Sequence, residues 1–246
     1  MKILVCISKV PDTTTKISFV DNDTKFNEDK VQFIVNPYDE WYALVRALEL
    51  TEKQGGTVTI INVGPADNDQ IIRKALAIGA NDAVRIEGSS NESFYVASQI
   101  AEYAKTQGYD IIMTGKETID YNGAEVGGMI AELMNISYVS HASTLDVDGG
   151  KATMKRNIEG GYETVEVTGT FVVSCQKGMA EARIPNMRGI MAARTKPLTI
   201  VAPVNVNQLT SIKIFTLPPA KAAVKMISPD NVAELVNLLH TEAKVI

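Results

Sequence analysis

The residues best suited to hold a ligand lie in the stretch GKETIDYNGAEVGGMIAEL, residues 115–133. An apolar run at 110–114 precedes it, and a helix is predicted to begin near residues 122–125. The free N–H groups and positive dipole end of such a helix favour an anion such as phosphate, and glycines permit close approach. The same residue types also serve as plain caps between a strand and a helix, so this stretch alone leaves both interpretations open.

Motifs for other chemistry are missing from the chain. Neither GxGxxG nor GxxxxGK[ST] occurs, which argues against a nicotinamide or Walker-type site. There is no nucleophile elbow and no spacing that suggests a triad, and we interpret His141 as a structural polar residue. Asp12, Asp39 and Glu40 are interpreted as helix-capping or solvated acids. With two histidines and no CxxC or HExxH, the sequence argues against a metal site.

Composition limits the partners and the location. The 246 residues carry a net charge of −5, which argues against nucleic acid or an anionic membrane surface as main partners. No stretch has the ~18 apolar residues that a membrane-spanning helix requires, so no direct membrane insertion is expected. The apolar start is too short for a signal sequence, and we expect a cytoplasmic protein. Cys6 and Cys175 are expected to be reduced, buried thiols.

The first half of the chain alternates between strands and helices. Strands are predicted at 2–8, 57–63, 83–87 and 110–115, and helices at 39–53, 66–79, 92–108 and after 122. Asp67 or Asn68 could cap the second helix. This order predicts an α/β fold with an open, mostly parallel, doubly wound sheet. A strand order of 3-2-1-4 would place the first and fourth strands side by side, with the loops at 8–12, 36–39, 63–65 and 115–125 at one edge.

The second half has a different organisation. Short strands between about 142 and 176, separated by Asp-Gly-Gly and Glu-Gly-Gly turns, predict an antiparallel meander. We assign residues 1–197 to one α/β domain, which contains this meander and a loop at about 182–196 that is rich in Arg and Met. Residues 198–246 are predicted to form an arm, broken by Pro218 and Pro219, with an amphipathic helix at 230–241. That helix could pack on a neighbouring chain or close its own domain.

Six segments in order give the chain a family resemblance. It resembles the beta subunit of electron transfer flavoproteins over essentially its full length, and the fold is therefore expected to be adenine-nucleotide-hydrolase-like. The segments are MKILVCISKVPDTTTKI, VNPYDEWYALVRALEL, VGPADNDQIIRKALAIGAND, TGKETIDYNGAEVGGMIAEL, MKRNIEGGYETVEV and ARIPNMRGIMAARTKPL.

The resemblance implies an electron-carrier subunit without bond chemistry of its own. Such a subunit pairs with an alpha subunit that carries a redox-active FAD. It holds AMP in ordinary members and a second FAD in electron-bifurcating ones. The pair takes electrons from acyl-CoA dehydrogenases and passes them towards a membrane quinone oxidoreductase. By position, the resemblance implies that the nucleotide is bound by Cys6, Ile7, Asn36, Pro37, Tyr38, Asp39, Val63, Asp120, Asn122, Gly123, Ala124, Glu125, Val126, Gly127 and Gly128.

The phosphate-binding turn departs from the family pattern. Ordinary members have Asn-Gln-Thr-Gly where this chain has Ala-Glu-Val-Gly at 124–127, so side-chain contacts to phosphate are lost and Glu125 adds a negative charge. Ala124 and Val126 match bifurcating members, but the Asp-Thr of those members is replaced by Asn122 and Gly123. AMP, FAD and an empty site all remain open, and we favour AMP.

The resemblance also assigns a docking surface at 182–196. Met187 falls where the family uses an apolar anchor for the dehydrogenase, and Arg183, Arg188 and Arg194 could steer an acidic partner. An ordinary basic surface loop is the alternative. Arg156, Glu159 and Glu163 are interpreted as interface or cross-strand charges.

The sequence argues against two other functions. A nucleotide-binding regulator of the universal-stress type would lack the meander and the arm. An NAD-dependent oxidoreductase is disfavoured by the missing glycine motif.

Overall fold

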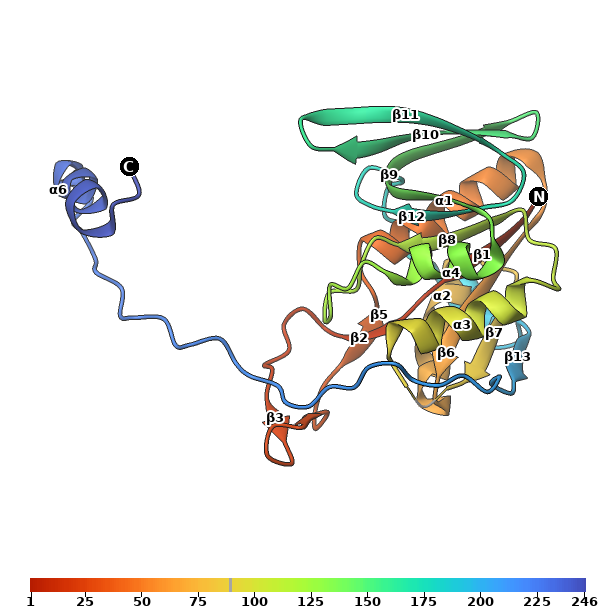
Figure 1. Ribbon diagram of the computed structural model, residues 1–246, viewed down its shortest axis with the longest axis horizontal. Coiled ribbons are helices and arrows are strands. Elements are labelled where there is room, and N and C mark those ends of the chain that lie inside the picture. Colours follow the sequence, from red (N-terminus) through yellow and green to blue (C-terminus); the bar gives the residue numbers. More distant parts are fainter. Residues whose placement is uncertain (89) are drawn as a thin grey trace.

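A nine-stranded sheet forms the body of the protein in the computed structural model, which describes residues 1–88 and 90–246. Its centre is made of β7 (Asp82–Glu87), β6 (Thr57–Gly64), β1 (Lys2–Cys6) and β8 (Ile111–Gly115), in that spatial order and all parallel. This is the order 3-2-1-4 that was considered for the ligand site, and it confirms the doubly wound α/β class (Figure 1).

Helices cover both faces of this sheet. α1 (Asp39–Gln54) and α2 (Asp69–Ile78) pack on the face that carries Ile3 and Val5 of β1. α3 (Ser93–Ala104) and α4 (Val126–Met134) pack on the opposite face, against Leu4 and Cys6. Because β1 is covered on both sides, nearly every residue of it is apolar, as expected for a central parallel strand.

The predicted meander is smaller than expected. β9 (Ser137–Asp148), β10 (Lys151–Ile158) and β11 (Gly161–Thr168) pair antiparallel and form a ribbon along one side of the body (Figure 1). β12 (Phe171–Cys175) instead runs parallel to both β8 and β9, so its assignment to an antiparallel meander was wrong. The physical reason is burial, since all of β12 lies inside the sheet with both faces covered.

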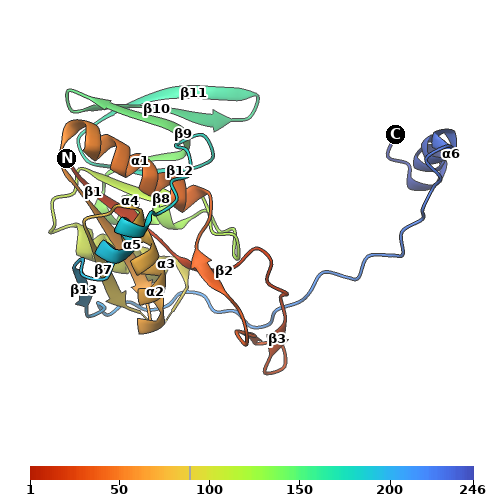
Figure 2. The same ribbon diagram turned by 180° about the vertical axis from the view of Figure 1, so that it is seen from behind.

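The C-terminal region starts inside the sheet. α5 (Met187–Ala193) is followed by β13 (Leu198–Val201), which adds a ninth strand next to β7. The chain then crosses α3, where the Gln99 amide exchanges two 2.8 Å hydrogen bonds with the Val204 backbone. It leaves the body and ends in α6 (Val232–Leu238) and a π-helical turn (Leu239–Ala243), far from the sheet (Figures 1 and 2).

Small hairpin-like sheets between β1 and α1 were not predicted. β2 (Lys9–Pro11) pairs with β5 (Phe33–Val35), and β3 (Phe19–Val20) pairs with β4 (Lys25–Phe26). The second pair contacts the departing arm, because Phe19 stacks on Phe215 at a centroid distance of 4.8 Å.

A short 3-10 turn, η1 (Ala66–Asn68), precedes α2. No helix in the described part of the chain is long and apolar enough to cross a membrane.

Candidate functional site

A crevice is expected where β1 and β8 lie side by side, because their following helices leave to opposite faces of the sheet. α1 covers one face and α4 the other. The loops after β1, β5, β6 and β8 all lie at this carboxyl edge. We refer to this region as the switch-point crevice, and most of the sequence-predicted nucleotide residues lie on these four loops.

Asn36 joins three of these loops. Its side chain is fully buried, with its carbonyl accepting from the Ile119 N–H at 3.0 Å and its amide donating to the Glu117 carbonyl at 2.9 Å. Its own N–H donates to the Ser8 carbonyl at 3.2 Å. The loops after β1, β5 and β8 are therefore held together by one amide side chain, which has little freedom to move.

A second buried amide fixes the loop after β6. Asn62 donates to the Ile7 carbonyl at 2.9 Å, and it accepts from the Asn68 amide at 2.9 Å. Asn68 stands at the N-cap position of α2, but its side chain makes no cap hydrogen bond, so the predicted cap was wrong. Its amide is committed to Asn62 instead. Sequence reasoning did not identify Asn62, because its partners lie on other loops.

Glu40 was interpreted as a capping or solvated acid, and the structure contradicts this. Its side chain is buried at 6% exposure in the first turn of α1, and its carboxylate accepts hydrogen bonds from the Ser8 N–H (2.7 Å) and the Ser8 hydroxyl (2.5 Å). Burial raises the pKa of Glu40 to about 8, although the Ser8 hydrogen bonds oppose that shift. The sequence pattern could not reveal this, because Ser8 lies 32 residues away.

Asp12 and Asp39 differ from Glu40. Asp12 accepts hydrogen bonds from the N–H and hydroxyl of Thr14, which close a turn and lower the pKa of the Asp12 carboxyl. Asp39 is the first residue of α1, and partial burial raises its pKa, while nearby Lys116 opposes the shift. Neither residue caps a helix through its side chain in the described structure.

The first turn of α4 presents backbone donors to the crevice. Glu125 holds the N-cap position without making a cap hydrogen bond, and its carboxylate accepts from the Ser93 hydroxyl of α3 at 2.6 Å instead. Within the described residues, no acceptor is recorded for the N–H groups of Val126, Gly127 or Gly128. These donors and the helix dipole can therefore hold an anion.

Gly127 is required by its surroundings. A Cβ atom at this position would lie 2.8 Å from the hydroxyl oxygen of Thr114 and 3.1 Å from the Tyr138 ring. The absence of a side chain lets the first turn of α4 sit directly on the end of β8. This close packing brings the free N–H groups to the edge of the sheet.

Three non-glycine residues around the crevice have positive φ angles. Tyr38 has φ 64°, Asn122 has φ 52° and Ala124 has φ 55°. Such backbone is costly for Tyr and Ala, and it is typical of sites where the surrounding structure fixes a loop for binding. Tyr38 exposes 60% of its surface at the start of α1, so its ring is available to a ligand or a second chain.

Acidic groups dominate the charge of these loops. Asp39, Glu40, Glu117 and Asp120 lie on the loops after β5 and β8 or at the start of α1. Lys116 pairs with Glu117 at 2.7 Å. This surplus negative charge opposes a bound anion, so an anion in the crevice would depend on the free N–H groups of α4 rather than on basic side chains.

The other residues that were predicted to bind the nucleotide lie at strand ends and in loops. Cys6 ends β1, Val63 is the last residue but one of β6, and both are buried, while Ile7 donates its N–H to the Ile61 carbonyl. Cys6 and Cys175 are buried free thiols, as predicted, and burial raises the pKa of both. The 120–128 loop and residues 36–39 border the switch-point crevice, where Pro37, Asp120, Gly123 and Gly128 also lie.

His141 lies in an irregular part of β9. Its φ is 55°, and its backbone N–H donates to the Ser174 hydroxyl at 3.0 Å where the β9–β12 register shifts. The Ser174 hydroxyl thus replaces a missing ladder bond. This backbone role agrees with a structural interpretation of His141.

The predicted docking loop lies on a different surface. The Trp41 ring N–H donates to the Arg183 carbonyl at 3.2 Å, and the Arg183 guanidinium pairs with Glu52 at 2.7 Å. Arg73 of α2 donates to the Ala193 carbonyl at 2.8 Å, so α5 is held on α2 and does not reach the crevice. Met187 begins α5 with 73% exposure, and Arg188 and Arg194 flank it in sequence.

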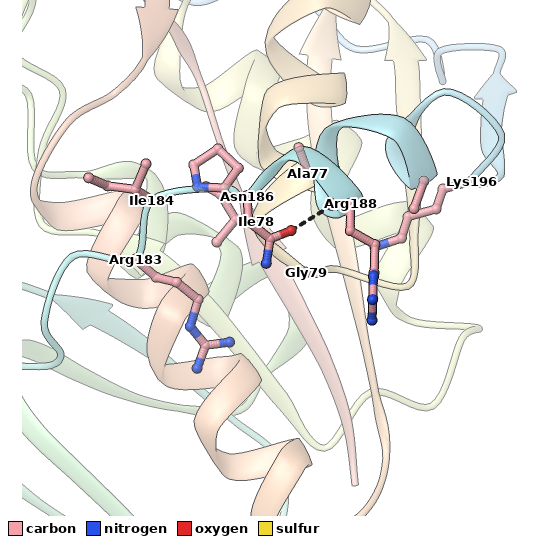
Figure 3. A pocket seen from close by; sticks show the side chains of 11 residues that line it. Ala77, Ile78, Gly79, Arg183, Ile184, Asn186, Arg188 and Lys196 are labelled. Atoms are coloured by element: carbon pink, nitrogen blue, oxygen red, sulfur yellow. Dashed lines mark hydrogen bonds between the residues drawn. The ribbon is translucent and has the colours of Figure 1, made fainter.

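A cavity of about 350 Å³ lies between this loop and the end of α2 (Figure 3). Arg183, Ile184 and Arg188 line it, and Asn186 caps α5 by accepting from the Gly189 N–H at 2.8 Å.

On the antiparallel β9–β10–β11 ribbon, Arg156 and Glu163 are directly opposite in register and 3.1 Å apart, which confirms a cross-strand charge pair. Glu159 stands in the turn between β10 and β11.

Within the described residues, no three or more His, Cys, Asp or Glu side chains lie together in a way that could hold a metal ion. The groups that the crevice offers a ligand are the N–H donors of α4, the exposed Tyr38 ring and apolar strand ends. This combination suits an organic anion.

The fold and the crevice define a doubly wound α/β protein whose polar loops converge where the strand order reverses. Residues 23–205 match the family model of the electron transfer flavoprotein domain. The chain belongs to the electron transfer flavoprotein family, among its beta subunits, which confirms the resemblance inferred from the sequence.

Individual relatives cover nearly all of the chain. It is 34% identical to the electron transfer flavoprotein subunit beta of Bacillus subtilis (strain 168), over 100% of both chains. It is 35% identical to the same subunit of Syntrophomonas wolfei subsp. wolfei, over 91% of this chain and 88% of the relative. It is 30% identical to the caffeyl-CoA reductase-Etf complex subunit CarD of Acetobacterium woodii, over 99% and 98%.

Proposed function

We propose that this chain is the beta subunit of a heterodimeric electron transfer flavoprotein that binds AMP in the switch-point crevice. An alpha subunit carries the redox-active FAD. The pair accepts electrons from acyl-CoA-type dehydrogenases and passes them towards a membrane quinone oxidoreductase. The FAD supplies the electron chemistry, and this chain contributes no bond chemistry of its own.

The observation that carries the proposal is the first turn of α4. The N–H groups of Val126, Gly127 and Gly128 have no recorded protein acceptor, and Gly127 allows the turn to lie against β8. These donors would hold the phosphate. Cys6, Ile7 and Val63 would form the apolar wall beside adenine, while Asn36 keeps the surrounding loops in place.

Glu125 weakens this site less than the sequence suggested. Its carboxylate is bound to the Ser93 hydroxyl at 2.6 Å, so one of its lone pairs is occupied by a donor from α3. The charge remains near the phosphate position and lowers affinity, but it does not occupy the N–H groups of the turn. The crevice therefore fits a nucleotide that is held mainly by backbone donors.

An FAD in place of AMP is the second candidate. Ala124 and Val126 are the small residues that the family resemblance associates with bifurcating members. One relative is named as a subunit of a caffeyl-CoA reductase-Etf complex, which supports a role in a reductase complex. Met187 and the arginines of the docking surface would then face a different dehydrogenase partner.

The test is a co-purification. This chain is co-expressed with a candidate alpha subunit, the complex is purified through a tag on this chain, and the nucleotides released by denaturation are identified by chromatography. One FAD and one AMP per complex support the proposal, and two FAD support the second candidate. A chain that stays monomeric and releases no nucleotide contradicts both.

A further inference from the structure

Glu40 is sealed at the base of the crevice between three elements. Its carboxylate accepts from the Ser8 N–H and hydroxyl of the loop after β1, at 2.7 and 2.5 Å. On the β8 side, a Cβ atom at Gly115 would lie only 2.8 Å from Glu40 Cγ. Only a glycine at 115 leaves room for this side chain, so the carboxyl is enclosed rather than solvated.

Most charged groups that face Glu40 are acidic. Asp120 approaches it from the loop after β8, Asp39 from its own helix, and the Cys6 thiol from β1. Lys116 acts on Asp39 and is paired with Glu117, and His141 of β9 also acts on Asp39. No cation is recorded as acting on the Glu40 carboxylate among the described residues. A phosphate bound nearby would add further negative charge to this group of acids.

We propose that this chain binds its phosphate-bearing nucleotide with the Glu40 carboxyl protonated, so that nucleotide binding takes up one proton from solvent above neutral pH. This inference rests on the proposed function, since it concerns the same crevice. The protonated carboxyl keeps its contacts with Ser8. Its carbonyl oxygen accepts from the Ser8 N–H, and its O–H donates to the Ser8 hydroxyl in a reversed hydrogen bond.

The direction of the pH effect follows from the charges. Burial raises the pKa of Glu40 to about 8 in the free chain, and a bound anion raises it further. Affinity is then constant where Glu40 is already protonated and falls as pH rises above 8, because the proton must be taken up on binding. The phosphate itself is doubly ionised well above its second pKa of about 6 and does not change charge there.

The experiment measures AMP affinity of the purified complex between pH 7 and 9 by calorimetry, in two buffers of different ionisation enthalpy. The wild type is expected to lose about tenfold in affinity across this range and to take up about half a proton at pH 8, as a group of pKa about 8 requires. Glu40→Gln preserves both Ser8 contacts and is expected to show a flat profile with no proton uptake. Glu117→Gln removes a charge from the neighbouring loop, and it should change affinity by a constant factor while the wild-type slope persists.

The affinity of the wild type for adenosine tests the same inference without a variant. Without a phosphate, its affinity for the wild type is expected to be nearly independent of pH. A flat wild-type AMP profile, or the same slope in Glu40→Gln or with adenosine, would overturn the inference. A wild-type complex that binds no AMP at any pH would contradict the proposed function instead, so the two failures are distinguishable.

Discussion

The side-chain carbonyl of Asn36 accepts a hydrogen bond from the backbone N–H of Ile119 at 3.0 Å, although the two residues are 83 positions apart. The same side chain donates to Glu117, and the Asn36 N–H reaches Ser8. One buried amide therefore determines how far apart the loops after β1, β5 and β8 lie. Its hydrogen bonds link three loops that border the crevice.

Asn36→Ala is expected to lower the free energy of unfolding by about 1–3 kcal/mol, because two partly buried backbone groups of the 117–119 segment lose their partners. Urea unfolding measures this change. Asn207→Ala, an exposed residue of the arm, is the matched control and should change stability by less than about 0.5 kcal/mol. Equal effects at the two positions would show that Asn36 does not hold the loops.

Gly127→Ala is expected to destabilise the protein by about 1–3 kcal/mol, because its Cβ would meet Thr114 at 2.8 Å. Gly128→Ala lies one residue further along the same helix, where its Cβ would be 3.4 Å from the Tyr138 ring. That variant is expected to be neutral or more stable, since Ala is the better helix former. Thermal unfolding compares the two, and Thr114→Ala combined with Gly127→Ala should restore part of the loss. No rescue would contradict the assigned clash.

The stability of the protein should depend on pH through Glu40. The unfolded-state pKa is about 4.5 and the folded value is about 8, so between these values the unfolded chain binds fewer protons than the native one. The Glu40 contribution to the free energy of unfolding therefore falls as pH rises from 4.5 to 8, by up to ~4–5 kcal/mol at about 1.4 kcal/mol per unit.

Denaturant unfolding of wild type and Glu40→Gln at several pH values checks this dependence. The glutamine variant is expected to gain stability relative to wild type as pH rises, and the other ionisable groups cancel in the difference. Parallel profiles of the two proteins from pH 5 to 9 would contradict a buried, titrating Glu40.

The arm should loosen when its contact with the β3–β4 pair is removed. Phe215 stacks on Phe19, and its N–H donates to the Asp23 carbonyl at 2.7 Å. Phe215→Ala is expected to speed amide exchange and proteolysis in residues 204–217, with little change in the unfolding of the sheet. Leu217→Ala, two residues further and 54% exposed, should have no such effect. Similar exchange in both variants would show that the stacking of Phe215 on Phe19 does not hold the arm in place.

Local patterns predicted much of the fold, and long-range contacts account for the errors. Alternating strand and helix periodicity predicted the parallel, doubly wound sheet, and the order β7-β6-β1-β8 agrees with the arrangement assumed for the position of the crevice. The same periodicity cannot distinguish a parallel from an antiparallel neighbour, so β12 was misassigned, and β13 was included in the arm. Glu40 and Asn68 were misread because their side chains bond Ser8 and Asn62, whose proximity only the folded chain creates.

Met187 is largely exposed at the start of α5; Arg73 bonds the end of this helix, and Trp41 bonds the loop before it at Arg183. A rigid support with an exposed, adaptable side chain suits a partner contact. Met187→Ala is therefore expected to weaken association with an electron-donating dehydrogenase about tenfold, while nucleotide content and unfolding stay as in wild type.

Surface plasmon resonance and stopped-flow reduction of the purified complex would measure this loss. Val224→Ala is the control, because Val224 is also an exposed apolar residue but belongs to the C-terminal arm. The contribution of charge to dehydrogenase binding can be measured separately from that of Met187. Arg188→Gln should reduce the association rate mainly at low salt. If Met187→Ala binds the dehydrogenase as tightly as wild type at all salt concentrations, the dehydrogenase contacts another surface, and α5 serves only to cover α2.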